Sequence, residues 1–208
     1  MEQQAAVTRA AVRAGEAPTQ IRSRSIQPRR AAQVKKINPY AKDPVTGCLN
    51  YMALRPQLLD GDIILFRAQG LQAKWRRLKE GDADHLGLVG RWGARVMVFE
   101  DTACGVIARP LSARLEAYTG QVELYKPNPV NKMSAHQREL ASTELLARMG
   151  NKLSWRQWFE PEACGVSLAE AVYTRAALPL TPPAPELGQS VAQCLVQAPQ
   201  LVRVGRLK

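Results

Sequence analysis

Five short apolar segments between residues 62 and 125 constrain this chain more than any other feature. The turn residues Asp60-Gly61 precede the first segment, and Trp92-Gly93 separates the second from the third. Runs of five or six residues that are rich in β-branched and aromatic side chains are typical of strands. Because short connections join neighbouring runs, the sequence predicts an antiparallel sheet. The expected strands are residues 62–67, 85–89, 95–100, 105–109 and 121–125.

Helical patterns follow these segments. Ser134 and Gln137 form a capping-box signal for a helix that ends at Gly150. A second helix is predicted to begin near Cys164 and to end before Pro179. Strands that are gathered in the first part of a domain, with helices after them, indicate an α+β fold.

The N-terminal segment differs from the rest in charge and pattern. Residues 1–45 carry nine basic and three acidic side chains, and so hold six of the eleven net positive charges of the chain. We expect residues 1–46 to be an extended arm, 47–190 to form the domain and 191–208 to be a C-terminal tail. A basic arm suits an acidic partner, either a protein groove in a larger assembly or a nucleic acid. A solvated tail is the alternative.

Composition excludes several classes of protein. No run approaches the roughly 20 apolar residues of a transmembrane helix, and the N-terminus lacks the apolar core of a secretory signal. The four cysteines form no C-x-x-C pair and the chain has two histidines, which predicts neither a disulfide scaffold nor a metal site. We therefore expect a protein without metal or cofactor in a reducing compartment.

Cys164 is the candidate nucleophile. It precedes a helical pattern, and the dipole of a helix favours a thiolate at the N-terminus. A buried core cysteine is the alternative interpretation. Cys104 is a rival nucleophile, but no helical pattern follows it.

His85 is the candidate general base, because the other histidine, His136, falls in the first turn of a predicted surface helix. Glu100 ends the next predicted strand, where its carboxylate can orient the imidazole. Asp84 and Asp101 are the alternatives, and Asp101 would point to the opposite face of the sheet. We prefer Glu100.

These residues resemble the YiiX-like branch of the NlpC superfamily, in which the papain-like order is permuted and histidine precedes cysteine. The resemblance covers roughly residues 54–190. Gly165-Val166 departs from the family's serine and acidic residue after the cysteine, and the nearby Glu160 and Glu162 oppose a thiolate. The similar segments are residues 61–67, 85–89, 98–100, 105–106 and 164–172.

The resemblance implies a permuted papain-like fold and a cysteine peptidase or amidase that acts on amide or ester bonds, including bacterial cell-wall peptides. Cys164 would attack the carbonyl, His85 would protonate the leaving group and Glu100 would orient His85. Two alternatives are an inactive docking component of a large assembly such as a virion, and a nucleic-acid binder. The expected location is accordingly cytoplasmic or virion-associated.

Overall fold

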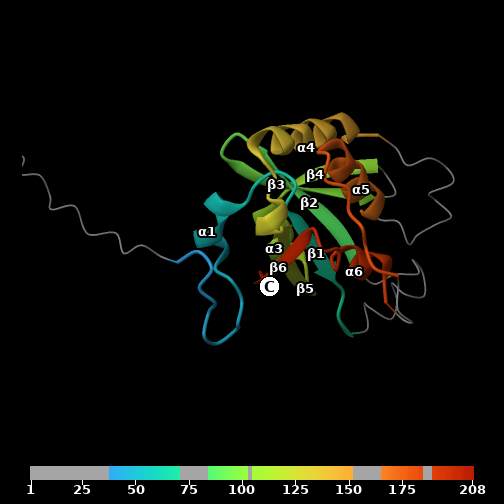
Figure 1. Ribbon diagram of the computed structural model, residues 1–208. Coiled ribbons are helices and arrows are strands. Elements are labelled where there is room, and N and C mark those ends of the chain that lie inside the picture. Colours follow the sequence, from blue (N-terminus) through green and yellow to red (C-terminus); the bar gives the residue numbers. More distant parts are fainter. Residues whose placement is uncertain (1–37, 71–83, 103–104, 152–164, 185–188) are drawn as a thin grey trace, which may run out of the picture. The chain divides into compact units, whose positions relative to one another are not determined.

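The computed structural model describes residues 38–70, 84–102, 105–151, 165–184 and 189–208. Within these ranges an antiparallel sheet has the strand order β4-β3-β2-β1-β5-β6 (Figure 1). All five strands that the sequence predicts are confirmed as β1 to β5. The strands are β1 Ile63–Arg67, β2 Asp84–Trp92, β3 Arg95–Thr102, β4 Gly105–Pro110, β5 Gln121–Pro127 and β6 Leu201–Arg206.

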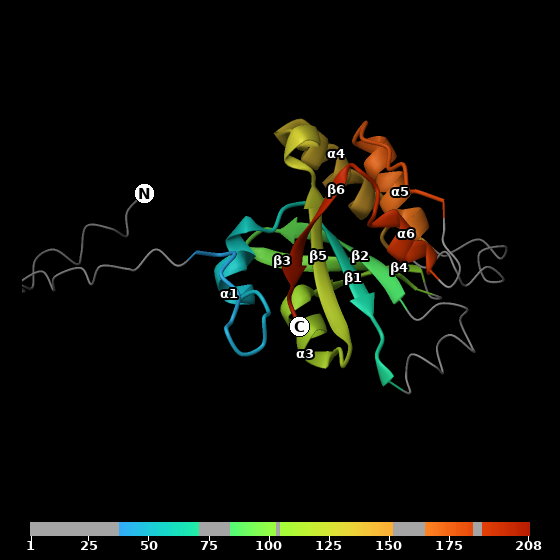
Figure 2. The same cartoon turned by 60° about the horizontal axis from the view of Figure 1, so that its bottom comes forward.

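Helices cover both faces of this sheet (Figures 1 and 2). We call the face under α4, α5 and α6 the α5 face, and the face under α1 and α3 the α3 face. The helices are α1 Tyr51–Leu54, α3 Leu111–Ala117, α4 Ala135–Arg148, α5 Val166–Arg175 and α6 Val191–Leu195, with 3₁₀ turns at Arg55–Gln57 and Pro129–Asn131.

The predicted capping box at the start of α4 is confirmed. The Ser134 hydroxyl accepts a hydrogen bond from the Gln137 backbone N–H (3.2 Å), and the Gln137 side chain accepts one from the Ser134 N–H (2.9 Å). The helix α5 begins directly after Gly165 and ends at Arg175, with Ala176 as its C-cap, in agreement with the predicted helix in this region.

The strand β1 shows why the sequence contains an unbroken apolar run. Ile63 and Leu65 pack in the core of the α5 face, whereas Ile64 and Phe66 pack in the core of the α3 face. Successive side chains of a strand alternate between faces, so a strand that is covered on both sides needs apolar residues throughout. This central strand pairs with β2 and β5 and positions both.

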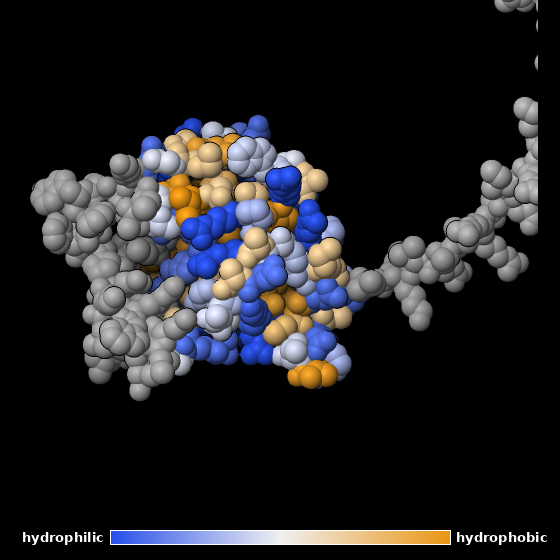
Figure 3. Space-filling view, turned by 180° about the vertical axis from the view of Figure 1, so that it is seen from behind, coloured by the Kyte–Doolittle hydropathy of each residue, from blue (hydrophilic) through white to orange (hydrophobic). Residues whose placement is uncertain are grey.

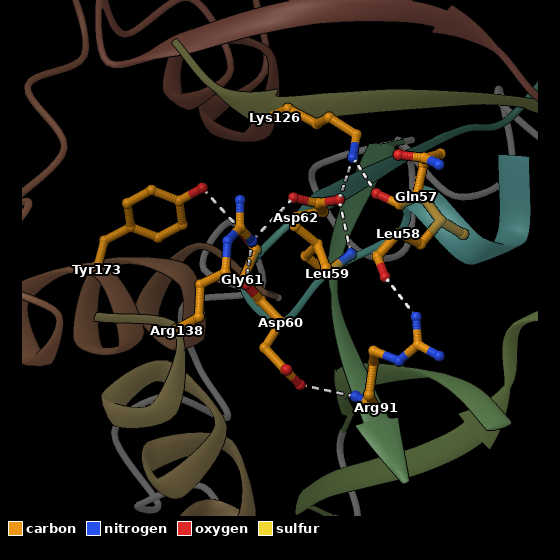
Figure 4. A network of polar contacts seen from close by, with 10 residues as sticks. All are labelled: Gln57, Leu58, Leu59, Asp60, Gly61, Asp62, Arg91, Lys126, Arg138 and Tyr173. Carbon is orange, nitrogen blue, oxygen red and sulfur yellow. Dashed lines mark hydrogen bonds and ion pairs between the residues drawn. The ribbon is translucent and has the colours of Figure 1, made fainter. Parts of the chain in front are cut away.

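The turn before β1 contains a fully buried carboxylate, Asp62 (Figure 4). It lies 2.9 Å from Nζ of Lys126 in β5 and 3.3 Å from Nη1 of Arg138 in α4, and it accepts a hydrogen bond from the Leu59 N–H. A buried charge needs partners of this kind, because desolvation costs several kcal/mol per ion. Asp62 therefore connects the turn to the sheet and to a helix.

The backbone of the same turn accepts further hydrogen bonds. Arg138 donates to the Asp60 carbonyl (2.6 Å), and the Tyr173 hydroxyl of α5 donates to the Gly61 carbonyl (2.8 Å). Burial raises the pKa of Tyr173 well above its usual value, so the hydroxyl keeps its proton. Gly61 has a φ of 83°, a conformation that favours glycine. Gly61 and Asp62 thus form a buried junction that joins the turn before β1 to β5, α4 and α5.

The C-terminal segment differs from the expected tail. Residues 191–208 supply α6 and the edge strand β6, and the compact unit that contains the sheet runs from Ile37 to Lys208. Leu207 is buried on the α3 face, and Lys208 donates through Nζ to the Leu115 carbonyl of α3. The sequence does not predict this strand, because its alternating pattern is short and its partner β5 lies far away in sequence.

Part of the expected arm is also described. Leu49 donates its N–H to the Arg206 carbonyl of β6 (2.7 Å), and Arg206 donates to the Thr46 carbonyl. Lys42 and Leu49 form an isolated antiparallel bridge. Residues 38–49 are therefore held against the C-terminal strand, whereas residues 1–37 lie outside the described ranges.

Large apolar side chains on the surface come from separate segments, such as Val45, Met52, Trp92 and Val130. Figure 3 shows a face on which hydrophilic and apolar residues are interspersed. Scattered exposure of this kind is normal for a protein surface. In the part of the chain that is described, none of the helices has the length and apolar character needed to cross a bilayer.

The Asp62 junction yields a prediction on stability. Asp62→Asn keeps the shape of the side chain but leaves Lys126 and Arg138 without their anion, so we expect the free energy of unfolding to fall by roughly 3–5 kcal/mol. Denaturation in urea measures the change. The matched control is Asp60→Asn, whose amide oxygen can still accept the Arg91 N–H. We expect a change below about 1 kcal/mol for the control. Equal effects would contradict the role of Asp62.

A second prediction concerns the C-terminal strand. Leu207→Ala removes a buried side chain and should lower the free energy of unfolding by roughly 2–4 kcal/mol. Val202→Ala, at a position of β6 that is 40% exposed, is the control and should cost less than about 1 kcal/mol. If both variants match the parent protein in thermal denaturation, the segment does not contribute to the fold.

Candidate active site

His85 is the second residue of β2 and points to the α3 face. Its ring stacks on Phe66, the residue opposite it in β1, with 4.7 Å between ring centroids and 10° between the ring planes. The edge of Tyr118 lies 6.2 Å away at 78°. With 15% of its side chain exposed, His85 has a fixed orientation and retains access to solvent.

Glu100 in β3 lies beside this ring. Its Oε1 is 2.6 Å from Nε2 of His85, so the structure brings these two predicted residues together. Gly87 is directly opposite Glu100 in the sheet, and a Cβ on Gly87 would lie 3.3 Å from Cγ of Glu100 and 2.5 Å from Cγ2 of Val98. A glycine here gives the Glu100 side chain room to reach His85.

The electrostatics of Glu100 follow from its partners. Burial acts to raise the pKa of this carboxyl, but the hydrogen bonds from His85 and Arg114 outweigh burial, and the pKa lies below its ordinary value. The carboxylate is therefore ionised across the neutral range. An ionised acceptor facing Nε2 places the ring proton on Nε2 in the neutral imidazole.

Arg114 in α3 completes the group, although no sequence pattern predicts it. Its Nε is 2.9 Å from Oε2 and its Nη2 is 2.9 Å from Oε1 of Glu100. The guanidinium also lies over the rings of Phe66 (4.9 Å) and Tyr118 (5.1 Å). In the sequence Arg114 is one charged residue in a short amphipathic stretch, and no local signal distinguishes it from a solvated side chain.

The two alternative carboxylates point to the other face. Asp101 accepts a hydrogen bond from the Ser167 hydroxyl of α5 (3.3 Å), and burial raises the pKa of Asp101. Asp84 accepts one from the Gln193 amide of α6. Both residues neighbour His85 or Glu100 in sequence, and the alternation of a strand directs them away from the His85 ring.

Cys164 lies outside the described residues, as do Cys104, Glu160 and Glu162. Gly165, the next residue after Cys164, is described and has a φ of 84°. A Cβ on Gly165 would lie 2.3 Å from the carbonyl oxygen and 3.0 Å from the nitrogen of Leu86. Gly165 therefore packs directly on the backbone of the residue that follows His85.

The helix α5 that follows Gly165 lies on the opposite face from the His85 ring. Leu168 and Val172 of this helix share a core with Leu86, whereas the stacking partner of His85, Phe66, belongs to the core of the α3 face. Pairing between β2 and β3 begins at Gly87 and Glu100, whereas Leu86 pairs with Leu65 of β1 alone, so Gly165 meets β2 one residue beyond the β3 pairing.

No three His, Cys, Asp or Glu side chains within the described ranges are grouped so that they could hold a metal ion. The groups that the structure does bring together are an imidazole, a carboxylate and a guanidinium. Such a set can hold a proton on one ring nitrogen and accept a proton at the other.

The close approach of Gly165 yields a prediction. Gly165→Ala places a methyl group into the Leu86 backbone at a positive φ, and we expect a loss of about 3 kcal/mol or more in urea denaturation. Gly150→Ala is the matched control, because Gly150 has a φ of 76° with no atom within 4 Å of the added Cβ. It should lose only about 1 kcal/mol. Similar losses would show that the contact with Leu86 is unimportant.

Comparisons with known proteins place the fold in context. No protein-family model and no curated protein matches the sequence. The structure is similar to the crystal structure of metalloprotein YiiX from Escherichia coli O157:H7, with a TM-score of 0.55 and 17% sequence identity. The match covers 72% of this chain and 98% of YiiX. At this identity the likeness shows the fold alone, and it agrees with the α+β class expected from the sequence.

Proposed function

We propose that this chain is a cysteine hydrolase with a permuted papain-like fold. In this proposal Cys164 is the nucleophile, His85 is the general base and Glu100 orients His85. The observation that carries the proposal is the 2.6 Å contact between Nε2 of His85 and Oε1 of Glu100 in a largely buried setting. A base whose second nitrogen is held by a third group is the arrangement that activates a nucleophile.

The geometry of His85 supports a role as a base. Nε2 carries the proton that faces Glu100, so Nδ1 has the free lone pair. The two hydrogen-bond contacts that the ring makes with described side chains, Glu100 and Arg114, are both at Nε2. A nucleophile that approaches Nδ1 can transfer its proton there, while Phe66 keeps the ring plane fixed.

The position of Gly165 supports Cys164 as the nucleophile. Consecutive Cα atoms are about 3.8 Å apart, and Gly165 packs on Leu86, the residue after His85. Of the other cysteines that the structure describes, Cys194 is buried in α6 and Cys48 donates to the Thr46 carbonyl (3.7 Å). The N-terminus of α5 is a source of positive potential that favours a thiolate.

The reaction proposed is hydrolysis of an amide or ester bond. The Cys164 thiolate adds to the carbonyl carbon, and the bond to the leaving nitrogen or oxygen breaks as His85 gives that atom its proton. Water then attacks the thioester, His85 accepts the proton of that water, and the acid and the free thiol are released. Peptides, including those of bacterial cell walls, are the first substrate class to test.

The second candidate function is an inactive docking component of a larger assembly. The observation that favours it is that α5 packs on the face opposite the His85 ring. Glu160 and Glu162 also add negative charge near Cys164 in sequence, which opposes a thiolate. In this case Cys164 would have the reactivity of an ordinary thiol.

Thiol alkylation separates these two functions. We expect iodoacetamide at pH 7 to modify Cys164 faster than Cys48, Cys104 and Cys194 in the folded protein, as followed by peptide mass spectrometry. His85→Ala should slow modification of Cys164 by about a hundredfold, which is the lower end of what a general base contributes. His136→Ala, which alters an exposed histidine, is the control and should change nothing.

Hydrolysis of model peptide amides and esters completes this test. Cys164→Ala should abolish any hydrolysis that the parent protein catalyses. Equal rates of alkylation for all accessible cysteines, unaffected by His85→Ala, would instead support the docking component.

A further inference from the structure

Arg114 contacts both carboxylate oxygens of Glu100 through Nε and Nη2. Three nitrogen–oxygen pairs between the guanidinium and the carboxylate measure 2.9–3.0 Å. The side chains are 16% and 4% exposed, so the pair is largely removed from water. The flat faces of Phe66 and Tyr118 hold the guanidinium in place. This is the geometry of a rigid ion pair rather than of a surface contact.

The same arginine reaches the imidazole. Its Nη2 is 3.3 Å from Nε2 of His85 while it also donates to Oε1 of Glu100. Glu100 is closer to Nε2, at 2.6 Å, so Nε2 donates to Glu100 and Arg114 lies beside this bond. The ring therefore faces a carboxylate whose charge a guanidinium balances.

We propose that Arg114 is a positioning residue for His85: it aims the Glu100 carboxylate at Nε2 and opposes a second proton on the ring. The inference deepens the proposed function and rests on it, since a general base needs a fixed ring and a nitrogen that can accept a proton. A carboxylate alone at this distance would strongly favour an imidazolium, in which neither nitrogen can act as a base.

The charged groups that contact the ring support this role. In the described part of the chain these are Glu100 of β3 and Arg114 of α3. The other neighbours of the ring are aromatic: Phe66 of β1 stacks on it, and Tyr118, which follows α3, contacts it edge-on. An arginine keeps its charge at every pH at which proteins are folded, so its opposition to the imidazolium is constant.

Nuclear magnetic resonance of ¹⁵N-labelled histidine tests the proposal on the full chain. Long-range ¹H–¹⁵N correlations report which ring nitrogen carries the proton and follow the protonation of the ring with pH. The chain has two histidines, so His136→Gln assigns the signals, and the exposed His136 is an internal reference in every other variant. In the parent protein we expect the neutral His85 ring to carry its proton on Nε2.

Arg114→Met removes the charge and keeps much of the apolar stem. We expect the protonation midpoint of the His85 ring to move to higher pH by roughly one unit or more. Arg114→Lys should move the midpoint less, because the positive charge remains although the two-nitrogen contact of the guanidinium with Glu100 is lost. The double variant Glu100→Gln, Arg114→Met should return the midpoint toward that of the parent protein. The reference His136 should not move.

Two results would overturn the proposal. One is a neutral His85 ring protonated on Nδ1 in the parent protein, a measurement that needs no folded variant. The other is an unchanged His85 midpoint in folded Arg114→Met. Neither measurement uses Cys164. If Cys164 is inert but the His85 titrations are as expected, the proposed hydrolase function is wrong and the role of Arg114 is still supported. If Cys164 is reactive but the His85 protonation midpoint is unchanged in Arg114→Met, only the role of Arg114 is wrong.

Discussion

The buried carboxylate of Asp62 is the constraint on which the arrangement of the sheet depends. It forms ion pairs with Lys126 of β5 and Arg138 of α4, so the turn before β1 is fixed to both the sheet and a helix. The same turn bonds directly to β2, because the Gly61 N–H donates to the Val89 carbonyl and the Val89 N–H donates to the Asp62 carbonyl. The register between β1 and β2 is therefore set four residues from His85. A slip of one residue would turn His85 to the other face, away from Phe66 and Glu100.

Each face of the sheet has its own polar chemistry because strand side chains alternate. On the α3 face Glu100 is paired with a cation and an imidazole, and its pKa is lowered. On the α5 face Asp101 has a hydroxyl partner, Ser167, and burial raises its pKa. Two adjacent residues of one strand thus have opposite electrostatics. The ionised carboxylate of Glu100 contacts a histidine and an arginine, whereas the carboxyl of Asp101 accepts a hydrogen bond from a neutral hydroxyl.

The candidate site was predictable where its residues are close in sequence or in strand register. His85 and Glu100 lie on two strands joined by a tight hairpin at Trp92-Gly93, so a separation of 15 residues brings them to the same end of the sheet. The capping box at Ser134 was predictable because it is a local signal. Arg114 was not, since its contact with Glu100 depends on how α3 folds back over β3.

The sequence by itself determined the strands β1 to β5, the starts of α4 and α5, and the face to which each strand residue points. These features follow from local hydrogen bonding and from the period of a strand or helix. Only the tertiary structure decided the partners of Asp62, the guanidinium beside Glu100, and the conversion of the expected tail into β6. Arg138 is 76 residues from Asp62, and Arg203 of β6 is 80 residues from Glu123 of β5. Pairs this distant leave no periodic signal, because packing of the whole chain brings them together.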